Sequence, residues 1–363
     1  SQKLKDICLT EITDGTHQTP TYSEYGYIFL SSKNVTTQKI DWDNVMFIPE
    51  KLHEELYKRV APQIDDILLA KNGTTGVAAI VDRDIVFDIY VSLALIRPNT
   101  KIVMPRYLLY AINNPVVKGY FDSSLKGIGV PNLHLKNIRE TPIKIYDLET
   151  QKAIVEKLDK VCELISLRKQ QLEKLDELVK ARFVEMFGDP VVNSKRWPVE
   201  TIENHIDLLT GFPFDSSGYV SKGVNICGGL IIMPQKIDWS ACKHWPQITG
   251  YEDYILRPND IVIALDRPWI SNGFKIAMVD REHLPALLIQ RTARIRAVDI
   301  NQHYLMQSLL LGRFDKHCNI TGSLVPHISP KDIKSYSVMI PPIELQNQFA
   351  TFVERVDQQK QTV

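Results

Sequence analysis

Short apolar runs separated by glycine, proline and asparagine occupy most of the chain. The runs at 67–70, 77–81 and 91–96 are typical of strands, because they are short, aliphatic and bounded by turn-forming residues. Residues 106–113 and 303–311 fit the helical period instead. The pattern therefore predicts globular regions in which helices and strands are mixed.

A different pattern follows residue 148. No proline or glycine occurs from 149 to 187, and Gly188-Asp189-Pro190 then ends the segment. Apolar residues recur there every seven positions, which predicts a five-heptad coiled-coil seam about 60 Å long. The alternative is an ordinary amphipathic helix on a globular core. The predicted interface residues of this segment are Leu158, Val161, Ile165, Leu172, Leu175, Val179 and Met186, with Arg168 and Arg182 interrupting the seam.

A second helix with the same spacing is predicted from residue 344, where Phe349, Val353 and Val356 form the matching seam. It has about half the length of the first helix before the sequence stops at Val363. We expect it to cover the first helix in part. Three alternatives stay open: a truncated form, residues beyond Val363, or self-association with a second chain that completes the coiled coil.

Two collinear sets of motifs show that the globular regions are repeats of one domain. Residues 129–138 match 324–333, residues 40–42 match 237–239, and residues 66–70 match 260–264, all at nearly the same offset. The predicted fold is α+β, with two mixed α/β domains separated by long helices. The predicted segments are domain 1 (1–146), the central helix (147–189), domain 2 (190–340) and the start of the distal helix (341–363).

Composition narrows the class of protein. The 363 residues are 44% hydrophobic and 24% charged, which suits a globular protein with two cores. No apolar run reaches the length of a membrane span, and the first ten residues lack a signal-peptide core, so we expect a cytoplasmic protein without membrane contact. The five cysteines have no zinc-site spacing, so no metal is expected. A net charge of zero disfavours a protein that simply coats DNA and suggests that a partner supplies part of the affinity.

Several phrases, in order and twice over, carry a resemblance to a known family. They are 66–76, 130–138 with its partner 325–333, and 341–346 with its degenerate copy 147–151. Over essentially the whole chain, the sequence resembles the DNA-specificity subunit of type I restriction–modification systems.

The resemblance implies two target-recognition domains, separated by two conserved helices that pack antiparallel as a coiled coil. Each domain would recognise one part of a split site in double-stranded DNA. Two methyltransferase subunits would dock around the helices, and restriction subunits would join them. The resemblance assigns no catalysis and no cofactor to this chain, because S-adenosylmethionine and ATP belong to the partners. A stiff spacer would fix the separation of the half-sites, since B-DNA repeats every 34–36 Å or so.

Candidate DNA contacts of the first domain lie in two loops. Lys71, Asn72, Thr74 and Thr75 follow a predicted strand, where lysine suits phosphate or guanine and asparagine suits adenine. The alternative is a polar hairpin turn, because Asn-Gly is also a strong turn signal. Lys126 and Asn132 bound a glycine-rich segment that is otherwise explained as a structural turn.

The second domain offers the corresponding candidates. Arg267, Trp269, Ser271 and Asn272 replace the first loop, and the replacement is expected if the two domains recognise different bases. His327 is the counterpart of Asn132. The last candidates form a basic run on a predicted strand, for which a solvated strand face is the alternative: Arg291, Arg294 and Arg296.

Two other functions stay open at this point. One is a self-contained DNA methyltransferase or nuclease with unrecognised motifs, although no phosphate-binding loop or methyltransferase tetrapeptide is present. The other is a coiled-coil scaffold without DNA, which would not need two copies of a globular domain.

Overall fold

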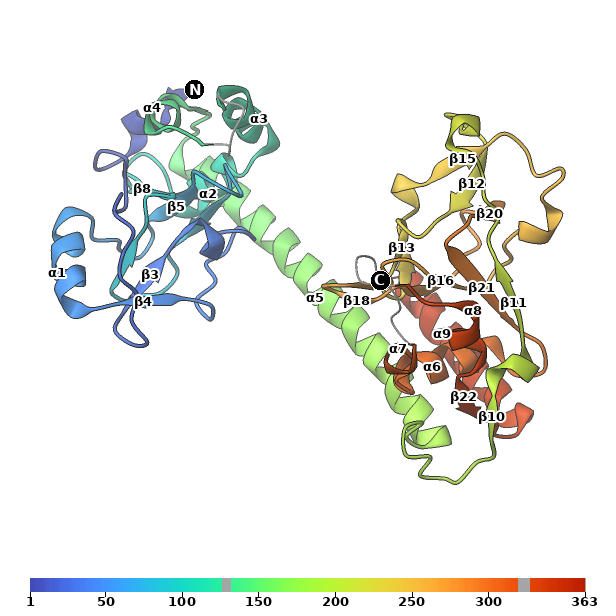
Figure 1. Ribbon diagram of the computed structural model, residues 1–363. Helices are drawn as coiled ribbons and strands as arrows, with labels where there is room; N and C mark the ends of the chain where they lie inside the picture. The colour runs from blue at the N-terminus through green and yellow to red at the C-terminus, as the bar shows by residue number, and fades with distance from the viewer. Residues whose placement is uncertain (126–131, 319–326, 363) are drawn as a thin grey trace. The chain divides into compact units, whose positions relative to one another are not determined.

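The computed structural model describes residues 1–125, 132–318 and 327–362, and it divides into two compact units, Ser1–Ser166 and Leu167–Val363. We call them unit 1 and unit 2 (Figure 1). The long helix α5 (Leu148–Phe187) begins in unit 1 and ends in unit 2. It matches the helix predicted at 149–187 and ends at Gly188, whose φ of +81° favours glycine.

Unit 1 contains a four-stranded sheet and a three-stranded sheet within the described residues. The first has the order β2-β8-β5-β6 and is antiparallel. In the second, β3 pairs antiparallel with β4 and parallel with β7. The strands are β1 (Gln2–Lys3), β2 (Thr13–Asp14), β3 (Tyr27–Leu30), β4 (Met46–Ile48), β5 (Ile67–Ala70), β6 (Ala78–Ile80), β7 (Phe87–Ile89), β8 (Leu93–Ile96) and β9 (Pro142–Ile143), where β1 pairs with β9.

The apolar run of β5 is continuous because both of its faces are buried. Ile67 and Leu69 point into a core shared with the helices, whereas Leu68 and Ala70 point into the core beneath the three-stranded sheet. A strand covered on both sides needs no polar alternation. The predictions of strands at 67–70, 77–81 and 91–96 are confirmed by β5, β6 and β8, the last two being slightly shorter than predicted.

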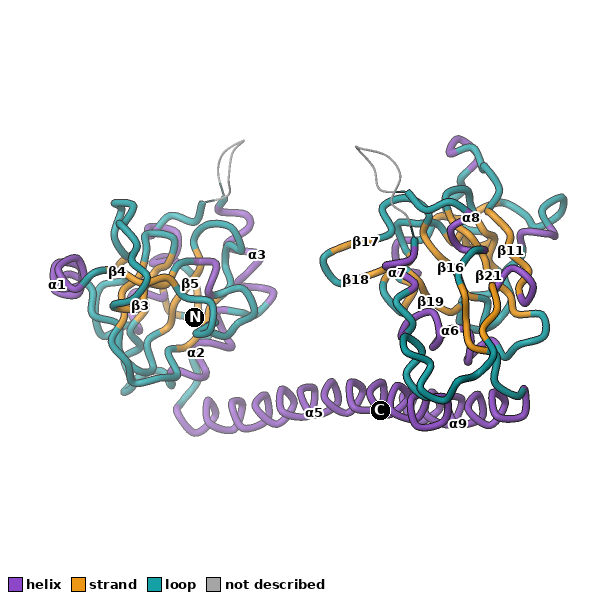
Figure 2. The backbone as a smooth tube through the Cα atoms, turned by 60° about the horizontal axis from the view of Figure 1, so that its bottom comes forward, coloured by secondary structure: helices purple, strands orange, loops and turns teal. Residues whose placement is uncertain are grey.

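Unit 2 repeats the topology of these sheets and adds two short strand pairs, β13–β14 and β17–β18. Its four-stranded sheet has the order β11-β21-β16-β19, and β12 pairs antiparallel with β15 and parallel with β20. The strands are β10 (Val199–Thr201), β11 (Ile206–Thr210), β12 (Val224–Cys227), β13 (Ile232–Met233), β14 (Lys236–Ile237), β15 (Lys243–Trp245), β16 (Ile261–Ala264), β17 (Trp269–Ile270), β18 (Gly273–Phe274), β19 (Ile276–Met278), β20 (Ala286–Leu288), β21 (Thr292–Ala297) and β22 (Ser337–Met339). The pair β17–β18 forms a hairpin that projects from unit 2 (Figure 2).

The helices lie mainly at one side of each four-stranded sheet. Asn301 caps α6 (Gln302–Leu311) by accepting a hydrogen bond from the His303 amide at 2.9 Å. Ser329 forms a capping box with Asp332 at the start of α8 (Pro330–Lys334). The remaining α-helices are α1 (Glu50–Arg59), α2 (Pro105–Ile112), α3 (Pro115–Ser124), α4 (Leu135–Glu140), α7 (Phe314–His317) and α9 (Ile343–Thr362). Short 3₁₀ helices occupy Leu4–Ile7, Ser32–Asn34, Ile202–His205, Ser216–Gly218, Trp239–Ala241 and Glu252–Tyr254. None of the helices in the described part of the chain is long and apolar enough to cross a membrane.

Helix α9 packs antiparallel against the second half of α5. The Phe349 ring lies 5.5 Å from that of Phe183, whereas Lys360, later in α9, pairs with Asp176, earlier in α5, at 2.7 Å. The core of this contact also receives α6 through Tyr304. The antiparallel pairing that the family resemblance implied is therefore confirmed. Of the predicted interface residues, those in this contact are Leu175, Val179, Met186, Phe349, Val353 and Val356.

The first half of the predicted seam is exposed in the structure. Every residue from 160 to 171 is exposed, including Val161 and Ile165, each about half exposed; Leu158 is also exposed, and Leu172 is half-buried. In the described part of the chain, α9 has 20 residues and α5 has 40. Arg182 forms an ion pair with Glu185 on its own helix and lies over the Phe352 ring. The contact of Arg182 with α9 is therefore made with an aromatic ring, and its ion pair lies within α5.

Candidate nucleic-acid interface

Three polar contacts, each with one buried partner, recur at matching positions and define the common frame of both units. Arg97 binds Asp66 through two nitrogens at 2.7 and 2.9 Å, and Arg296 binds Asp260 in the same way, both at 2.7 Å. These bonds hold the pKa of each guanidinium above its ordinary value. In the second contact, the indole of Trp42 donates to Asp82 in unit 1, and the indole of Trp239 donates to Asp280 in unit 2. In the third, the side chains of Gln151 and Gln346 each accept a hydrogen bond from a backbone amide at 2.8 Å.

Residues at the end of the frame, where β5 and β16 run into loops, differ between the units. The register of the strands shows which residues are equivalent. Asp14 pairs with Ala94 in unit 1, and Thr210 pairs with the equivalent alanine, Ala293, in unit 2. The same register makes Lys71 equivalent to Leu265, and Val77 equivalent to Lys275. Loop residues on this end are candidates for recognition, because loops on a rigid scaffold tolerate change.

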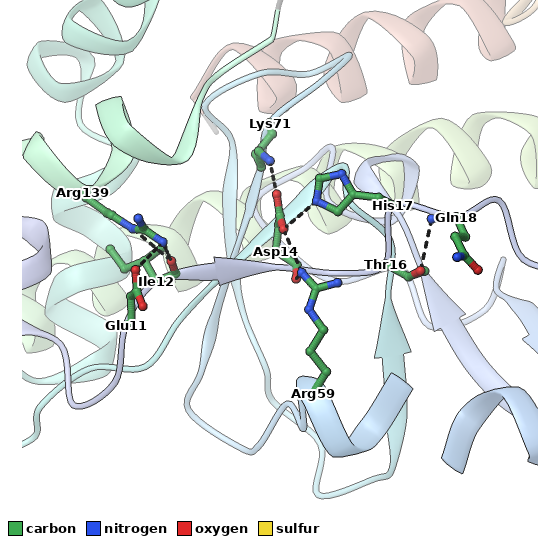
Figure 3. Close-up of polar contacts among 9 residues, drawn as sticks. All are labelled: Glu11, Ile12, Asp14, Thr16, His17, Gln18, Arg59, Lys71 and Arg139. Atoms are coloured by element: carbon green, nitrogen blue, oxygen red, sulfur yellow. Dashed lines mark hydrogen bonds and ion pairs between the residues drawn. The ribbon is translucent and has the colours of Figure 1, made fainter. Parts of the chain in front are cut away.

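In unit 1, Asp14 gathers three basic side chains at this end (Figure 3). Its carboxylate accepts from the Lys71 ammonium at 2.5 Å, and it lies 3.2 Å from His17 Nε2 and 3.5 Å from an Arg59 nitrogen. Asp14 and Lys71 are almost fully buried, whereas His17 and Arg59 are more than half exposed. Lys71, a predicted DNA contact, thus has an internal partner, and its predicted contact with DNA stays a prediction.

The loop after Lys71 carries the other candidates. Asn72 forms a β-bridge with Asn132, and the side-chain oxygen of each is buried without a hydrogen-bond partner among the described residues. Thr74 is exposed, and the Thr75 hydroxyl donates to the Lys71 carbonyl at 3.4 Å. The bridge brings the two predicted loops together, because Asn72 and Asn132 come from different ones. Lys126 lies outside the described residues.

In unit 2 the equivalent bridge joins Asp266 and His327. His327 Nδ1 lies 2.7 Å from the Asp266 carboxylate, and Arg291 lies 3.2 Å from its other oxygen. An ion-paired cluster therefore replaces the two unpaired amide oxygens of unit 1. Arg291 is 74% exposed and His327 is 43% exposed, so both are accessible to a ligand.

The candidates after β16 divide between the core and the solvent. Trp269 lies in β17 and packs on Phe274 with a ring distance of 5.2 Å, so its indole is half-buried. Arg267, Ser271 and Asn272 are exposed, the last two at the tip of the projecting hairpin. These three side chains can contact a surface laid against this end of unit 2.

Arg294 and Arg296 lie in β21 and have partners inside unit 2. Arg294 is buried against Asp207, and burial lowers the pKa of its guanidinium. Arg296 binds Asp260 as described above. Both arginines neutralise carboxylates of the fold, and their predicted phosphate contact stays a prediction. Arg291 alone of the basic run faces the loop end.

Asp266 and Arg291 also line a cavity of about 560 Å³ in unit 2. Its lining includes Lys243, Arg267, Lys275 and Arg291, with an apolar wall of isoleucines. Lys275 is 6% exposed, and its ammonium donates to the Gly229 carbonyl. Burial lowers the pKa of Lys275. The cavity therefore offers several hydrogen-bond donors around a concave, positively charged surface.

Sequence reasoning missed Asp14, His17, Arg59 and Lys275. Two signals could have found some of them: Lys275 is a single lysine in the apolar run 274–279, and Asp14 and His17 are an acidic and a basic residue three positions apart. Arg59 gave no signal, because only the packing of α1 brings it to Asp14. Among the described residues no group of histidine, cysteine and acidic side chains could hold a metal ion. Burial raises the pKa of Cys8 and of Cys318 to about 12, which disfavours the reactive thiolate.

Comparison with known proteins agrees with this arrangement of two homologous halves. Residues 1–177 match the family model described as the type I restriction modification DNA specificity domain. The MjaVIII specificity subunit of Methanocaldococcus jannaschii is 25% identical over 319 residues, which cover 83% of this chain and 74% of that protein. The EcoAI specificity subunit of Escherichia coli is 27% identical over 214 residues, which cover 54% of this chain and 34% of that protein.

Solved structures share the fold. The type I restriction–modification S subunit of M. genitalium aligns with a TM-score of 0.57 at 13% identity, over 99% of this chain and 90% of that one. A chain from a structure of type I restriction–modification complex assembly aligns with a TM-score of 0.52 at 18% identity, with the same coverage.

Two matching domains on a shared helix, each with polar loops at one end, define a tandem-repeat recognition protein. Residues 1–177 carry a type I restriction modification DNA specificity domain, and the chain is similar to type I specificity subunits over most of its length. The relatives described above give no support to the two alternatives, a scaffold without DNA and a self-contained methyltransferase or nuclease.

Proposed function

We propose that this chain recognises a split sequence in double-stranded DNA, with one half-site contacted by each unit. The observation that carries the proposal is the contrast between a common frame and a variable loop end. The Asp–Arg pairs of the frame are the same in both units, whereas the bridge at the loop end is Asn72–Asn132 in one and Asp266–His327 in the other. Two folds that differ mainly at their contact residues suit two different half-sites.

The chemistry of the loop ends supports different base preferences. Unit 1 offers amide groups, and amides pair with the major-groove edge of adenine. Unit 2 offers Arg267 and Arg291 instead, and arginine pairs with guanine or with phosphate. The candidates named from the sequence, including Thr74, Ser271 and Asn272, lie at the same ends and would complete these contacts.

Helix α5 would set the gap between the half-sites. It is one continuous helix of 40 residues that supplies core residues to both units, namely Val155 in unit 1 and Val179 in unit 2. A continuous helix is stiff over this length, so we infer that it acts as the spacer.

Partner subunits would supply the chemistry. We infer that two methyltransferase subunits dock along α5 and α9, that restriction subunits join them, and that the chain itself catalyses no reaction. The exposed apolar side chains from 158 to 167 of α5 support docking, because such a stripe is otherwise costly in water. S-adenosylmethionine and ATP would be bound by the partners. The complex would act in the cytoplasm, where its DNA substrate lies.

Methylome sequencing tests the proposal. A host that expresses this chain with its methyltransferase should carry a methylated motif of two specific parts around a fixed unspecified gap. Insertion of seven residues, one heptad, between 160 and 171 should lengthen the gap by about three base pairs and leave the two specific parts unchanged. The matched control is the methyltransferase expressed without this chain. A continuous motif, or a gap that ignores the insertion, would contradict the proposal.

A further inference from the structure

Lys275 is a buried cation without a counter-ion in the described part of unit 2. No carboxylate oxygen among the described residues lies within 4.0 Å of its ammonium, and the Gly229 carbonyl is its recorded hydrogen-bond partner. An ammonium keeps three donors, so at least two point elsewhere. Burying an unpaired charge is costly, which makes a lysine at this position unfavourable unless a ligand compensates it.

Unit 1 shows that the fold has no need of this cation. The equivalent residue is Val77, whose carbonyl accepts the Ala70 amide just as the Lys275 carbonyl accepts the Ala264 amide. The buried lysine of unit 1, Lys71, has Asp14 as its partner, and unit 2 has Thr210 in place of Asp14. Each unit therefore has one such buried lysine. Lys71 of unit 1 has a carboxylate partner, whereas Lys275 of unit 2 has none among the described residues.

Three other basic residues line the same cavity as Lys275. Lys243, Arg267 and Arg291 line the same 560 Å³ space, and Asp266 is the acidic residue in that lining. Asp266 already has two partners, since Arg291 lies 3.2 Å from one carboxylate oxygen and His327 Nδ1 lies 2.7 Å from the other. The cavity thus keeps an excess of positive charge.

The two arginines of the cavity have a strained backbone. Arg267 has a φ of 46° and Arg291 a φ of 64°, both in the left-handed region. At the position of Arg267, unit 1 has Gly73 with a φ of 74°, where glycine adopts this conformation freely. An arginine retained in place of glycine costs about 1 kcal/mol, and such strain is found at functional sites.

Resting on the proposed function, we propose that the cavity of Lys243, Arg267, Lys275 and Arg291 binds a phosphate group, with Lys275 at its floor. The shape decides between the parts of DNA. Base edges are recessed in the grooves of a duplex, whereas phosphates protrude and can enter a concave site. The phosphate belongs to the DNA backbone, and a free phosphate or nucleotide is the other source that the experiment separates.

The experiment compares three variants of the full chain with the wild type. Lys275→Met keeps the length of the side chain and removes its charge, and Arg267→Gly installs the residue of unit 1. Lys157→Met removes one charge from an exposed position of α5 and is the matched control. Binding of a 30-base-pair duplex is measured at several salt concentrations, and melting temperature is measured with and without 10 mM inorganic pyrophosphate.

We expect Lys275→Met to weaken duplex binding about tenfold and to reduce the salt slope by about one, because one phosphate contact is lost. Arg267→Gly should weaken binding in the same direction. Both variants should melt at the wild-type temperature or above it, because a buried charge or a strained arginine has been removed. The control should match the wild type in binding and melting.

The outcomes separate the inference from the proposed function. Unchanged duplex affinity and salt slope in Lys275→Met, with no pyrophosphate effect on the wild type, overturns the inference while DNA binding stands. Pyrophosphate stabilisation of the wild type but not of Lys275→Met, with unchanged duplex affinity, assigns the cavity to a free phosphate. If the wild type binds no duplex, the proposed function fails and the pyrophosphate measurement alone decides the inference. A lower melting temperature for Lys275→Met also overturns it, since Lys275 would then stabilise the fold.

Discussion

Units 1 and 2 have the same strand order and the same buried Asp–Arg pair, yet they treat the loop end of the sheet in opposite ways. In unit 1, Asp14 neutralises the buried Lys71, and the bridge between the loops is made by two asparagines. In unit 2, the buried lysine has no carboxylate partner among the described residues, and the bridge is made by an aspartate and a histidine whose side chains lie 2.7 Å apart. The comparison separates residues that hold the sheet from residues that can be exchanged without changing it. A constant frame with different residues at its loop end suits two half-sites of different sequence.

The largest expected effect comes from the frame itself. Arg97→Met and Arg296→Met should each destabilise their own unit by about 3–5 kcal/mol, because Asp66 or Asp260 is left buried without its partner. Hydrogen–deuterium exchange of the strand amides measures each unit separately. The exposed Arg281 provides the control, Arg281→Met, with an expected change within about 0.5 kcal/mol. If Arg97→Met alone destabilised both units equally, or neither unit, the Asp–Arg pair would not hold the frame of its own unit. The same holds for Arg296→Met.

The buried pair of unit 1 should behave differently from a frame pair. Asp14→Asn should cost about 3 kcal/mol in unit 1, because Lys71 then lacks a counter-charge. The double variant Asp14→Thr with Lys71→Leu, which installs the residues of unit 2, should recover most of that loss. Exchange rates in β5 and β8 report the result. A double variant as unstable as Asp14→Asn would mean that the pair is part of the frame.

The two halves of α5 provide a third contrast. Val179→Ala should cost about 1–2 kcal/mol in unit 2, because Val179 is buried against α9. Val161→Ala should change the stability of the isolated chain by less than about 0.5 kcal/mol, because Val161 is half exposed. Urea unfolding followed by tryptophan fluorescence measures both. A larger cost for Val161 in the presence of the methyltransferase would locate the docking surface that we propose.

The smallest change in stability is expected at the bridge. Asn72→Asp with Asn132→His transfers the ion pair of unit 2 to unit 1 and should stabilise unit 1 by less than about 1 kcal/mol, since the side chains are only half-buried. Its effect on recognition should be larger: the half-site of unit 1 should change while the other half-site and the gap remain. Methylome sequencing checks this. A change in both half-sites would argue against separate recognition by the two units.

Much of the architecture could be predicted from the sequence because it depends on local patterns. The apolar run at 67–70, the proline- and glycine-free stretch from 149 to 187 and the repeated phrases each reflect a period or a spacing along the chain. Burial on both faces of β5 and one continuous helix follow directly from such patterns. The antiparallel contact of α9 came from the family resemblance and is confirmed by Phe183, Phe349 and the Lys360–Asp176 pair.

Only the tertiary structure decided which of the charged residues face each other. Residue type alone predicts DNA contacts at Lys71, Arg294 and Arg296, whereas the fold gives each a carboxylate from a distant segment: Asp14, Asp207 and Asp260. Such pairs depend on long-range register, because Asp14 and Lys71 meet only after β2 and β5 both pair with β8. The sequence by itself determined the repeat, the helices and the strands. Whether a given lysine is neutralised within the fold or left open to a ligand was decided by packing between strands far apart in the chain.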